Sequence, residues 1–175
     1  MQKALVRGHW LWLNKVLFTN RTGQQKEWEF VSRPQKSTDG VMIFTQLGEK
    51  ILVVSVFRYP VGKFVLEFPA GMMDKGTPEE AAARELREET GYTPDYLKVG
   101  RNVYNDPWKS TESHYFVSAV VSSDPESQEL DPAESINIHL LNKTNFLEEL
   151  LELKHKENYE IDSRLYFFAL GLQFK

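Results

Sequence analysis

Residues 66–92, LEFPAGMMDKGTPEEAAARELREETGY, form the stretch of sequence that decides the fold. The segment Pro78–Thr90 predicts a helix, because proline stands near its start and alanine, leucine and charged residues fill it. Gly91 follows directly and predicts the end of that helix. Residues 64–68 form a short apolar run that predicts a strand ending at Pro69. A strand, a glycine-containing loop and a helix are therefore expected in that order.

Three acidic residues of this helix, Glu85, Glu88 and Glu89, stand three and four positions apart. At the helical repeat their side chains fall within roughly a third of the circumference. Like charges so placed are unfavourable unless a cation lies between them, and Mg²⁺ prefers oxygen ligands. Ala81 and Ala82 are expected on the same side, where small side chains would let a metal and a diphosphate approach.

The alternative interpretation is a solvated charged face, in which Arg84 and Arg87 pair with the acids. Taken alone, the charge run fits both interpretations equally well. The preceding strand and loop, together with Gly91 at the helix end and Leu86 as an anchor into the core, favour a functional site.

The segment resembles the Nudix box, Gly-x5-Glu-x7-Arg-Glu-U-x-Glu-Glu-x-Gly-U, in which U is bulky and apolar. The matching residues are Gly71, Arg84, Glu85, Leu86, Glu88, Glu89, Gly91 and Tyr92. The chain departs from the pattern at Thr77, where the box has its first Glu, and it is one residue short before Arg84. Thr77 can still cap the helix, but the loop must follow a tighter path.

Segments outside the box extend the resemblance to the ADP-ribose and ADP-sugar pyrophosphatases, the nucleoside diphosphate sugar hydrolases of this family. These segments are EWEFVSR, VFRYP, LEFPAG, DPWKSTE, DPAESINI and IDSRLYFFAL. The resemblance implies hydrolysis of a nucleotide sugar, with ADP-ribose favoured, to a nucleoside monophosphate and a sugar phosphate. It also implies Mg²⁺, with Mn²⁺ as a substitute, and a homodimer whose two chains share the base pocket.

The resemblance assigns substrate contacts to strand residues before the box. Trp28 would stack on the base, since a flat indole suits a purine, although a packed strand aromatic is an equal alternative. Arg33 and Arg58 would contact the diphosphate, because guanidinium groups match phosphate oxygens; the alternative is a surface arginine. Glu67 belongs to the same expected site, and Ala70 would offer its backbone carbonyl to the metal.

Residues after the box complete the expected site. Glu134, in an acidic loop, would complete metal binding or activate the attacking water, or else be a solvated carboxylate. Glu112 is a weaker candidate for substrate binding. Arg84 is expected to orient a box glutamate, and His114 and His139 are expected to be structural.

The rest of the chain predicts an α+β fold, and with the resemblance a Nudix α/β/α sandwich with a mixed β-sheet and an N-terminal antiparallel hairpin. Strands are expected at residues 15–19, 27–32, 41–46, 51–58, 96–104 and 115–121. Helices are expected at residues 142–153 and 161–172, and a long loop at residues 122–135. The expected division is an N-terminal dimerisation region, residues 1–36, and a Nudix domain, residues 37–175.

Composition narrows the classes of function. The 175 residues contain no cysteine, which excludes disulfides and cysteine nucleophiles and fits a reduced cytoplasmic setting. A net charge of −4 argues against a nucleic-acid partner. No apolar run is long enough to span a membrane, and the N-terminus has no signal-peptide pattern. GDP-mannose, another nucleotide sugar or a nucleoside triphosphate remain alternative substrates, and a non-catalytic nucleotide-sugar-binding module remains the alternative class.

Overall fold

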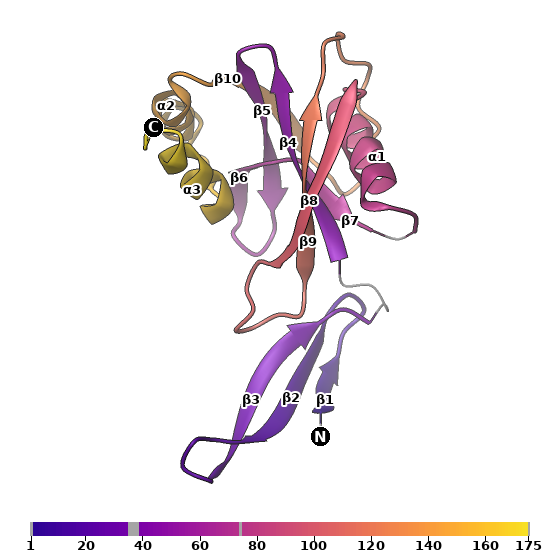
Figure 1. Ribbon diagram of the computed structural model, residues 1–175, viewed down its shortest axis with the longest axis vertical. Helices are drawn as coiled ribbons and strands as arrows, with labels where there is room; N and C mark the ends of the chain where they lie inside the picture. The colour runs from indigo at the N-terminus through magenta and orange to yellow at the C-terminus, as the bar shows by residue number, and fades with distance from the viewer. Residues whose placement is uncertain (1, 35–38, 74, 175) are drawn as a thin grey trace.

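The computed structural model describes residues 2–34, 39–73 and 75–174, and it arranges them around two β-sheets (Figure 1). A three-stranded sheet near the N-terminus lies at one end of the molecule. A mixed eight-stranded sheet forms the body, with helix α1 on one side and helices α2 and α3 on the other. The expected α/β/α sandwich with an N-terminal antiparallel region is confirmed.

The N-terminal sheet has three strands, whereas the sequence predicted two. Strand β1 (Gln2–Arg7) pairs antiparallel with β2 (Trp12–Thr19), which pairs antiparallel with β3 (Gln25–Ser32). Most side chains described in β1 are exposed. The strand therefore lacks the alternation of buried and exposed residues by which a strand is recognised from sequence.

The central sheet has the order β11-β6-β5-β4-β9-β8, with β10 paired to β5 and β7 paired to β4. Its strands are β4 (Asp39–Leu47), β5 (Lys50–Arg58), β6 (Lys63–Glu67), β7 (Ala70–Met72), β8 (Tyr96–Tyr104), β9 (Ser113–Val120), β10 (Ile136–Asn142) and β11 (Glu160–Ile161). Strand β4 runs parallel to β9 and antiparallel to β5 and β7, which makes the sheet mixed. Strand β7 thus brings the start of the box against β4.

Hydrophobic cores lie on both faces of this sheet. Helix α1 (Pro78–Thr90) covers one face, and its Leu86 is fully buried among valine and isoleucine side chains, as expected from the sequence. Helices α2 (Phe146–Glu157) and α3 (Ser163–Gly171) cover the other face through residues such as Phe146 and Leu165.

Two sequence expectations are wrong in their details. The helix expected at residues 142–153 begins at Phe146, because residues up to Asn142 belong to strand β10. Ala81 and Ala82 are buried in the core beneath α1 and do not leave room for a metal and a diphosphate. Their small size instead allows α1 to pack closely on the sheet.

Strand β3 contacts the loop between β8 and β9. The amide of Val31 donates to the carbonyl of Lys109 at 2.8 Å, and the amide of Thr111 donates back to Val31 at 3.2 Å. The Trp28 indole donates to the carbonyl of Trp108 at 2.7 Å. The N-terminal sheet is therefore joined to the body by backbone hydrogen bonds.

The domain boundary expected between residues 36 and 37 lies outside the described residues. Within the part of the chain that the structure describes, no helix has the length and apolar character that crossing a bilayer requires.

Thr77 replaces the first box glutamate and acts as the N-cap of α1. Its hydroxyl accepts from the Glu80 amide at 3.3 Å, and the Glu80 carboxylate accepts from the Thr77 amide at 2.8 Å. We expect Thr77→Ala to lower the free energy of unfolding by about 1 kcal/mol in urea denaturation. Thr77→Ser, which retains the capping oxygen, should stay within about 0.5 kcal/mol of the parent. Equal losses in the two variants would contradict the cap.

Candidate active site

Two polar cavities lie side by side and share strand β7 as a common wall. One, the carboxylate cavity, has a volume of about 490 Å³. The other, the arginine cavity, has a volume of about 360 Å³. Both are lined by Ala70, Gly71 and Met72. The start of the box therefore stands between two sites of opposite chemical character.

The carboxylate cavity brings together the acids expected from the sequence. Its acidic lining residues are Glu85, Glu88, Glu89, Glu129, Asp131 and Glu134, and Arg84 is its one basic lining residue among those described. A Cβ atom at Gly71 would collide with the carboxylate of Glu85. Glycine is therefore required here so that the helix carboxylate can lie directly against strand β7.

Glu89 is the most buried of these acids, with 7% of its surface exposed. Its carboxylate accepts from the Ala70 amide at 3.2 Å. Burial, reinforced by the negative charge of Glu85, raises the pKa of Glu89 to about 8. Burial also raises the pKa of Glu85, against the opposing charge of Arg84. Ionisation of both carboxyl groups is therefore unfavourable when no cation is bound.

Arg84 holds two acids of its own helix. Its guanidinium lies 2.8 Å from Glu85 and 3.0 Å from Glu88, and it donates to the Met72 carbonyl at 3.1 Å. These contacts hold the Arg84 guanidinium against two box glutamates, Glu85 and Glu88. They also tie α1 to the end of strand β7.

Glu134 reaches the same cavity from the loop before β10. Its carboxylate accepts from the Asp131 amide at 3.0 Å, within a tight turn. Its charge contributes to the raised pKa values of both Glu85 and Glu89. The structure therefore places Glu134 within electrostatic reach of the helix acids.

The donor set of this cavity fits a hard divalent cation. All of the acids offer oxygen ligands. Burial raises the pKa of both Glu85 and Glu89, and neighbouring acids raise them further: Glu85 for Glu89, and Glu88 and Glu134 for Glu85. A cation would offset both effects. As the side chains stand, no three acidic or histidine residues among those described lie close enough to share one ion. Arg84 pairs with Glu85 and Glu88 instead, so metal binding would have to displace or share these contacts.

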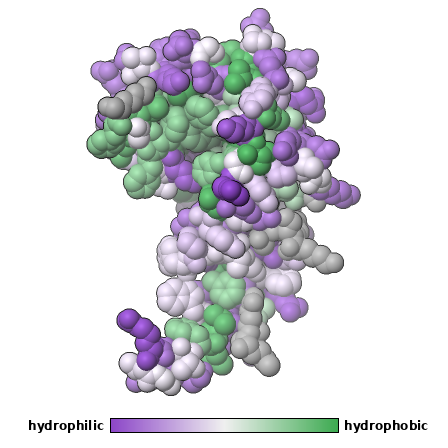
Figure 2. Space-filling view, in the orientation of Figure 1, coloured by the Kyte–Doolittle hydropathy of each residue, from purple (hydrophilic) through white to green (hydrophobic). Residues whose placement is uncertain are grey.

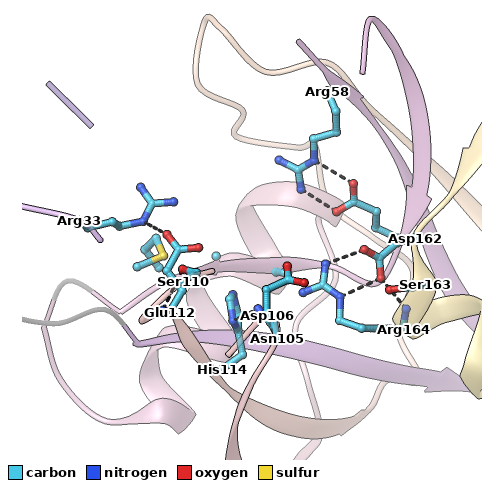
Figure 3. Close-up of a pocket in the computed structure, with 14 residues that line it drawn as sticks. Arg33, Arg58, Asn105, Asp106, Ser110, Glu112, His114, Asp162, Ser163 and Arg164 are labelled. Carbon is cyan, nitrogen blue, oxygen red and sulfur yellow. Dashed lines mark hydrogen bonds and ion pairs between the residues drawn. The ribbon is translucent and has the colours of Figure 1, made fainter. Parts of the chain in front are cut away.

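The arginine cavity contains three pairs of arginine and acid (Figure 3). Arg58 on β5 makes two hydrogen bonds to the buried Glu67, at 2.8 and 2.6 Å. Arg33, which follows β3, lies 2.6 Å from Glu112.

The third pair belongs to the start of α3. Arg164 makes two hydrogen bonds of 2.8 Å to Asp162, which also caps that helix. Although burial raises the pKa of Asp162, its bonds to Arg164 outweigh burial and lower that pKa.

These pairs leave donors for a phosphorylated ligand. A guanidinium carries five N–H groups, and Arg58 and Arg164 each use only two of them on their acid. The pairing fixes the orientation of each guanidinium, while the remaining N–H groups can meet phosphate oxygens. The cavity therefore offers oriented guanidinium donors next to the carboxylates.

Sequence reasoning missed several residues of the arginine cavity. Asp162 and Arg164 lie in the quoted segment IDSRLYFFAL, and an acid before an apolar helical run is a helix-cap signal that could have drawn attention to them. His114, expected to be structural, lines the cavity and bonds Asn105 at 2.6 Å. Burial lowers the pKa of His114, which favours its neutral form.

Trp28 is not among the described residues that line either cavity. It is half-exposed on β3, its indole bonded to the Trp108 carbonyl and its ring set edge-on against Phe18. His139 bonds Ser55 at 3.1 Å and likewise does not line the cavities.

The comparison with protein families agrees with this geometry: the NUDIX domain model matches residues 34–163. The chain belongs to the Nudix hydrolase family. Nudix hydrolases generally use divalent metal ions, which agrees with the donor set of the carboxylate cavity.

Relatives match nearly the whole chain. A putative nudix hydrolase 2 from Caenorhabditis elegans is 34% identical over 99% of this chain and 84% of its own length. An ADP-sugar pyrophosphatase from Mus musculus is 30% identical, with coverages of 98% and 85%. An ADP-ribose pyrophosphatase from Saccharomyces cerevisiae is 32% identical, with coverages of 93% and 77%. A crystal structure of an ADP compounds hydrolase shares the fold, with a TM-score of 0.76 at 22% identity, covering 99% of this chain and 92% of that one.

The raised pKa of Glu89 predicts how the metal-free protein responds to pH. Between the ordinary value of 4.5 and about 8, the unfolded chain has lost this proton while the folded protein keeps it. The free energy of unfolding, measured in EDTA, should therefore fall as pH rises through this window. Glu89→Gln should reduce that slope and raise the melting temperature at pH 8. The control is Glu79→Gln, because Glu79 is exposed on the same helix. If the free energy of unfolding changed equally with pH in the parent and in Glu89→Gln, the raised pKa would not belong to Glu89.

Proposed function

We propose that this protein hydrolyses the pyrophosphate linkage of a nucleoside diphosphate sugar, with ADP-ribose favoured and Mg²⁺ as the cation. The proposal is carried by one observation: strand β7 places a carboxylate cavity and an arginine cavity on its two sides. A diphosphate lying across this strand would meet guanidinium donors on one side and the acids on the other.

The acids of the carboxylate cavity have the role of metal ligands in this proposal. Glu85, Glu88, Glu89 and Glu134, with the carbonyl of Ala70, would hold Mg²⁺, and Mn²⁺ could replace it because both accept oxygen ligands. A bound divalent cation supplies acidification of a water molecule and neutralisation of phosphate charge. Arg84 orients Glu85 and Glu88 and does not itself need to contact the substrate.

The residues of the arginine cavity position the substrate. Arg33 and Arg58 bind the diphosphate, and Glu112 and Glu67 hold their guanidinium groups in place. The oxygen of water attacks one phosphorus, and the bond from that phosphorus to the bridging oxygen breaks. Glu134 or another acid of the cavity accepts the proton of the water. The products are a nucleoside monophosphate and a sugar phosphate.

The named relatives support this substrate class. The ADP-sugar pyrophosphatase of Mus musculus matches over 98% of this chain, and the ADP-ribose pyrophosphatase of Saccharomyces cerevisiae over 93%. A GDP-mannose pyrophosphatase of Yersinia enterocolitica is 28% identical over 71% of the chain, and it keeps GDP-mannose as a second candidate. A binding module without activity is disfavoured, because three buried or half-buried helix acids have no evident use in a pure binder. The lack of cysteine fits a reduced cytoplasmic setting.

Hydrolysis of a panel of nucleotide sugars and nucleoside triphosphates, with Mg²⁺ and with EDTA, tests the function directly. We expect ADP-ribose to be the preferred substrate and EDTA to abolish activity. Glu85→Gln and Glu89→Gln should each lower kcat/KM more than tenfold, about 1.4 kcal/mol in the activation barrier. Glu79→Gln, exposed on the same helix, should retain activity. Losses under tenfold in both cavity variants would defeat the proposal.

We also propose a homodimer whose base-binding pocket includes Trp28. The N-terminal sheet leaves apolar side chains exposed at the lower end of the molecule (Figure 2). Burying such side chains between two copies is favourable. Light scattering should report twice the 20.3 kDa of one chain. Trp28→Ala should raise KM for ADP-ribose more than it lowers the melting temperature. An active species with the mass of one chain would rule out the shared pocket.

A further inference from the structure

The acidic loop before β10 caps the C-terminal end of the catalytic helix. The last carbonyls of a helix lack partners within the helix. Here the Glu129 amide donates to the Glu88 carbonyl at 2.9 Å, and the Glu126 amide donates to the Gly91 carbonyl at 2.9 Å. The side-chain amide of Gln128 donates to the Glu89 carbonyl at 2.6 Å. The loop thus satisfies the backbone carbonyls of two helix acids, Glu88 and Glu89, and of Gly91.

Gly91 allows the loop to approach this closely. Its φ of +72° is in the left-handed region, and a Cβ atom would collide with the Glu126 carbonyl. Leu130, two residues after Gln128, packs against the core beneath α1. The loop is therefore held against the helix end at its beginning and in its middle.

Gln128 is the one described side chain that bonds the helix end and strand β10 together. The same amide that donates to Glu89 lies 3.3 Å from the carbonyl of Ile136, the first residue of β10. Gln128 is half-buried, whereas the neighbouring ion pair between Arg87 and Glu129 is exposed. Exposed ion pairs contribute little, so the Gln128 bridge is the stronger link of the two.

Glu134 lies in the loop segment that this bridge closes. Glu134 is exposed, and within the described part of the chain its hydrogen bonds join it only to Asp131, in its own turn. Ile136 is held in the sheet by its pairing with Val56 of β5, and the Ser135 carbonyl accepts from the Phe57 amide. Gln128 joins the start of the loop to Ile136, so the segment 129–135, which includes Glu134, is closed at both ends. The negative charge of Glu134 already reaches Glu89 across the cavity.

We propose that Gln128 is a positioning residue that fixes Glu134 relative to Glu85 and Glu89. The inference rests on the proposed function, in which Glu134 binds the cation or activates water. It predicts that loss of the Gln128 amide reproduces the effect of losing Glu134. Substrate binding should be spared, because the arginine cavity lies on the other side of β7.

A double-mutant cycle tests this inference. Gln128→Met keeps the length of the side chain and removes both hydrogen bonds, and it is compared with Glu134→Gln and with the double variant. The matched control is Gln46→Met, which removes a side-chain amide bonded to the Gly48 carbonyl in a distant turn. We expect Gln128→Met to lower kcat about tenfold or more, with KM within about twofold. The double variant should be no slower than Glu134→Gln alone.

A second variant and a metal-binding measurement keep the test valid if Gln128→Met does not fold or if the protein hydrolyses no nucleotide sugar. If Gln128→Met unfolds at the assay temperature, Gln128→Asn replaces it, because its shorter amide cannot bond both carbonyls. Binding of Mn²⁺ alone to the metal-free protein is measured for the four proteins of the cycle: the parent, Gln128→Met, Glu134→Gln and the double variant. The inference is thereby tested even if no nucleotide sugar is hydrolysed. We expect Gln128→Met to change whichever quantity Glu134→Gln changes, and not to add to it. The inference would be overturned if Gln128→Met caused an equal loss in the parent and in Glu134→Gln. It would also be overturned if either single variant left both kcat and Mn²⁺ binding unchanged.

Discussion

The burial of acidic side chains at one helix face is the constraint on which the rest of this structure depends. Glu89 is almost fully enclosed and Glu85 lies directly on Gly71, so ionisation of both carboxyl groups is unfavourable: burial raises the pKa of each, and the charge of Glu85 raises the pKa of Glu89 further. Such an arrangement opposes folding unless other interactions hold it. Here the fully buried Leu86 and the small Ala82 fasten the opposite side of the helix to the sheet. The packing energy of that core permits the unfavourable electrostatics of the site.

Strand β7 turns this helix face into a site with two sides. Three residues long, it pairs with β4, and all three of its residues line both cavities. The guanidinium groups on its far side are each held by an acid, which keeps them oriented without exhausting their donors. Arg33 connects this site to the N-terminal sheet, because it follows β3 and pairs with Glu112 in the loop that β3 also contacts. The placement of that sheet thus bears directly on the arginine cavity.

The shortened box is accommodated at the two ends of the helix. At the beginning, Thr77 and Glu80 satisfy each other's amides and so replace the structural support of the absent first acid. At the end, Gly91 and the acidic loop satisfy the last carbonyls. Both ends are therefore stabilised by local hydrogen bonds, and the orientation of Glu85 and Glu89 does not need the missing side chain.

The sequence by itself determined the elements whose signals are local. Helix α1 has the bounds that its proline and Gly91 predict, and strand β8 has those that its apolar pattern predicts. The spacing of Glu85, Glu88 and Glu89 placed them on one face because helical geometry depends on neighbouring residues alone. Only the tertiary structure decided which distant groups meet them. The placement of the Asp162–Arg164 pair beside Arg58, the burial of Ala82 and the bond from Gln128 to the Glu89 carbonyl depend on how strands and loops far apart in the chain pack together. Such contacts leave no periodic trace in the sequence, because no local preference of the residues requires them.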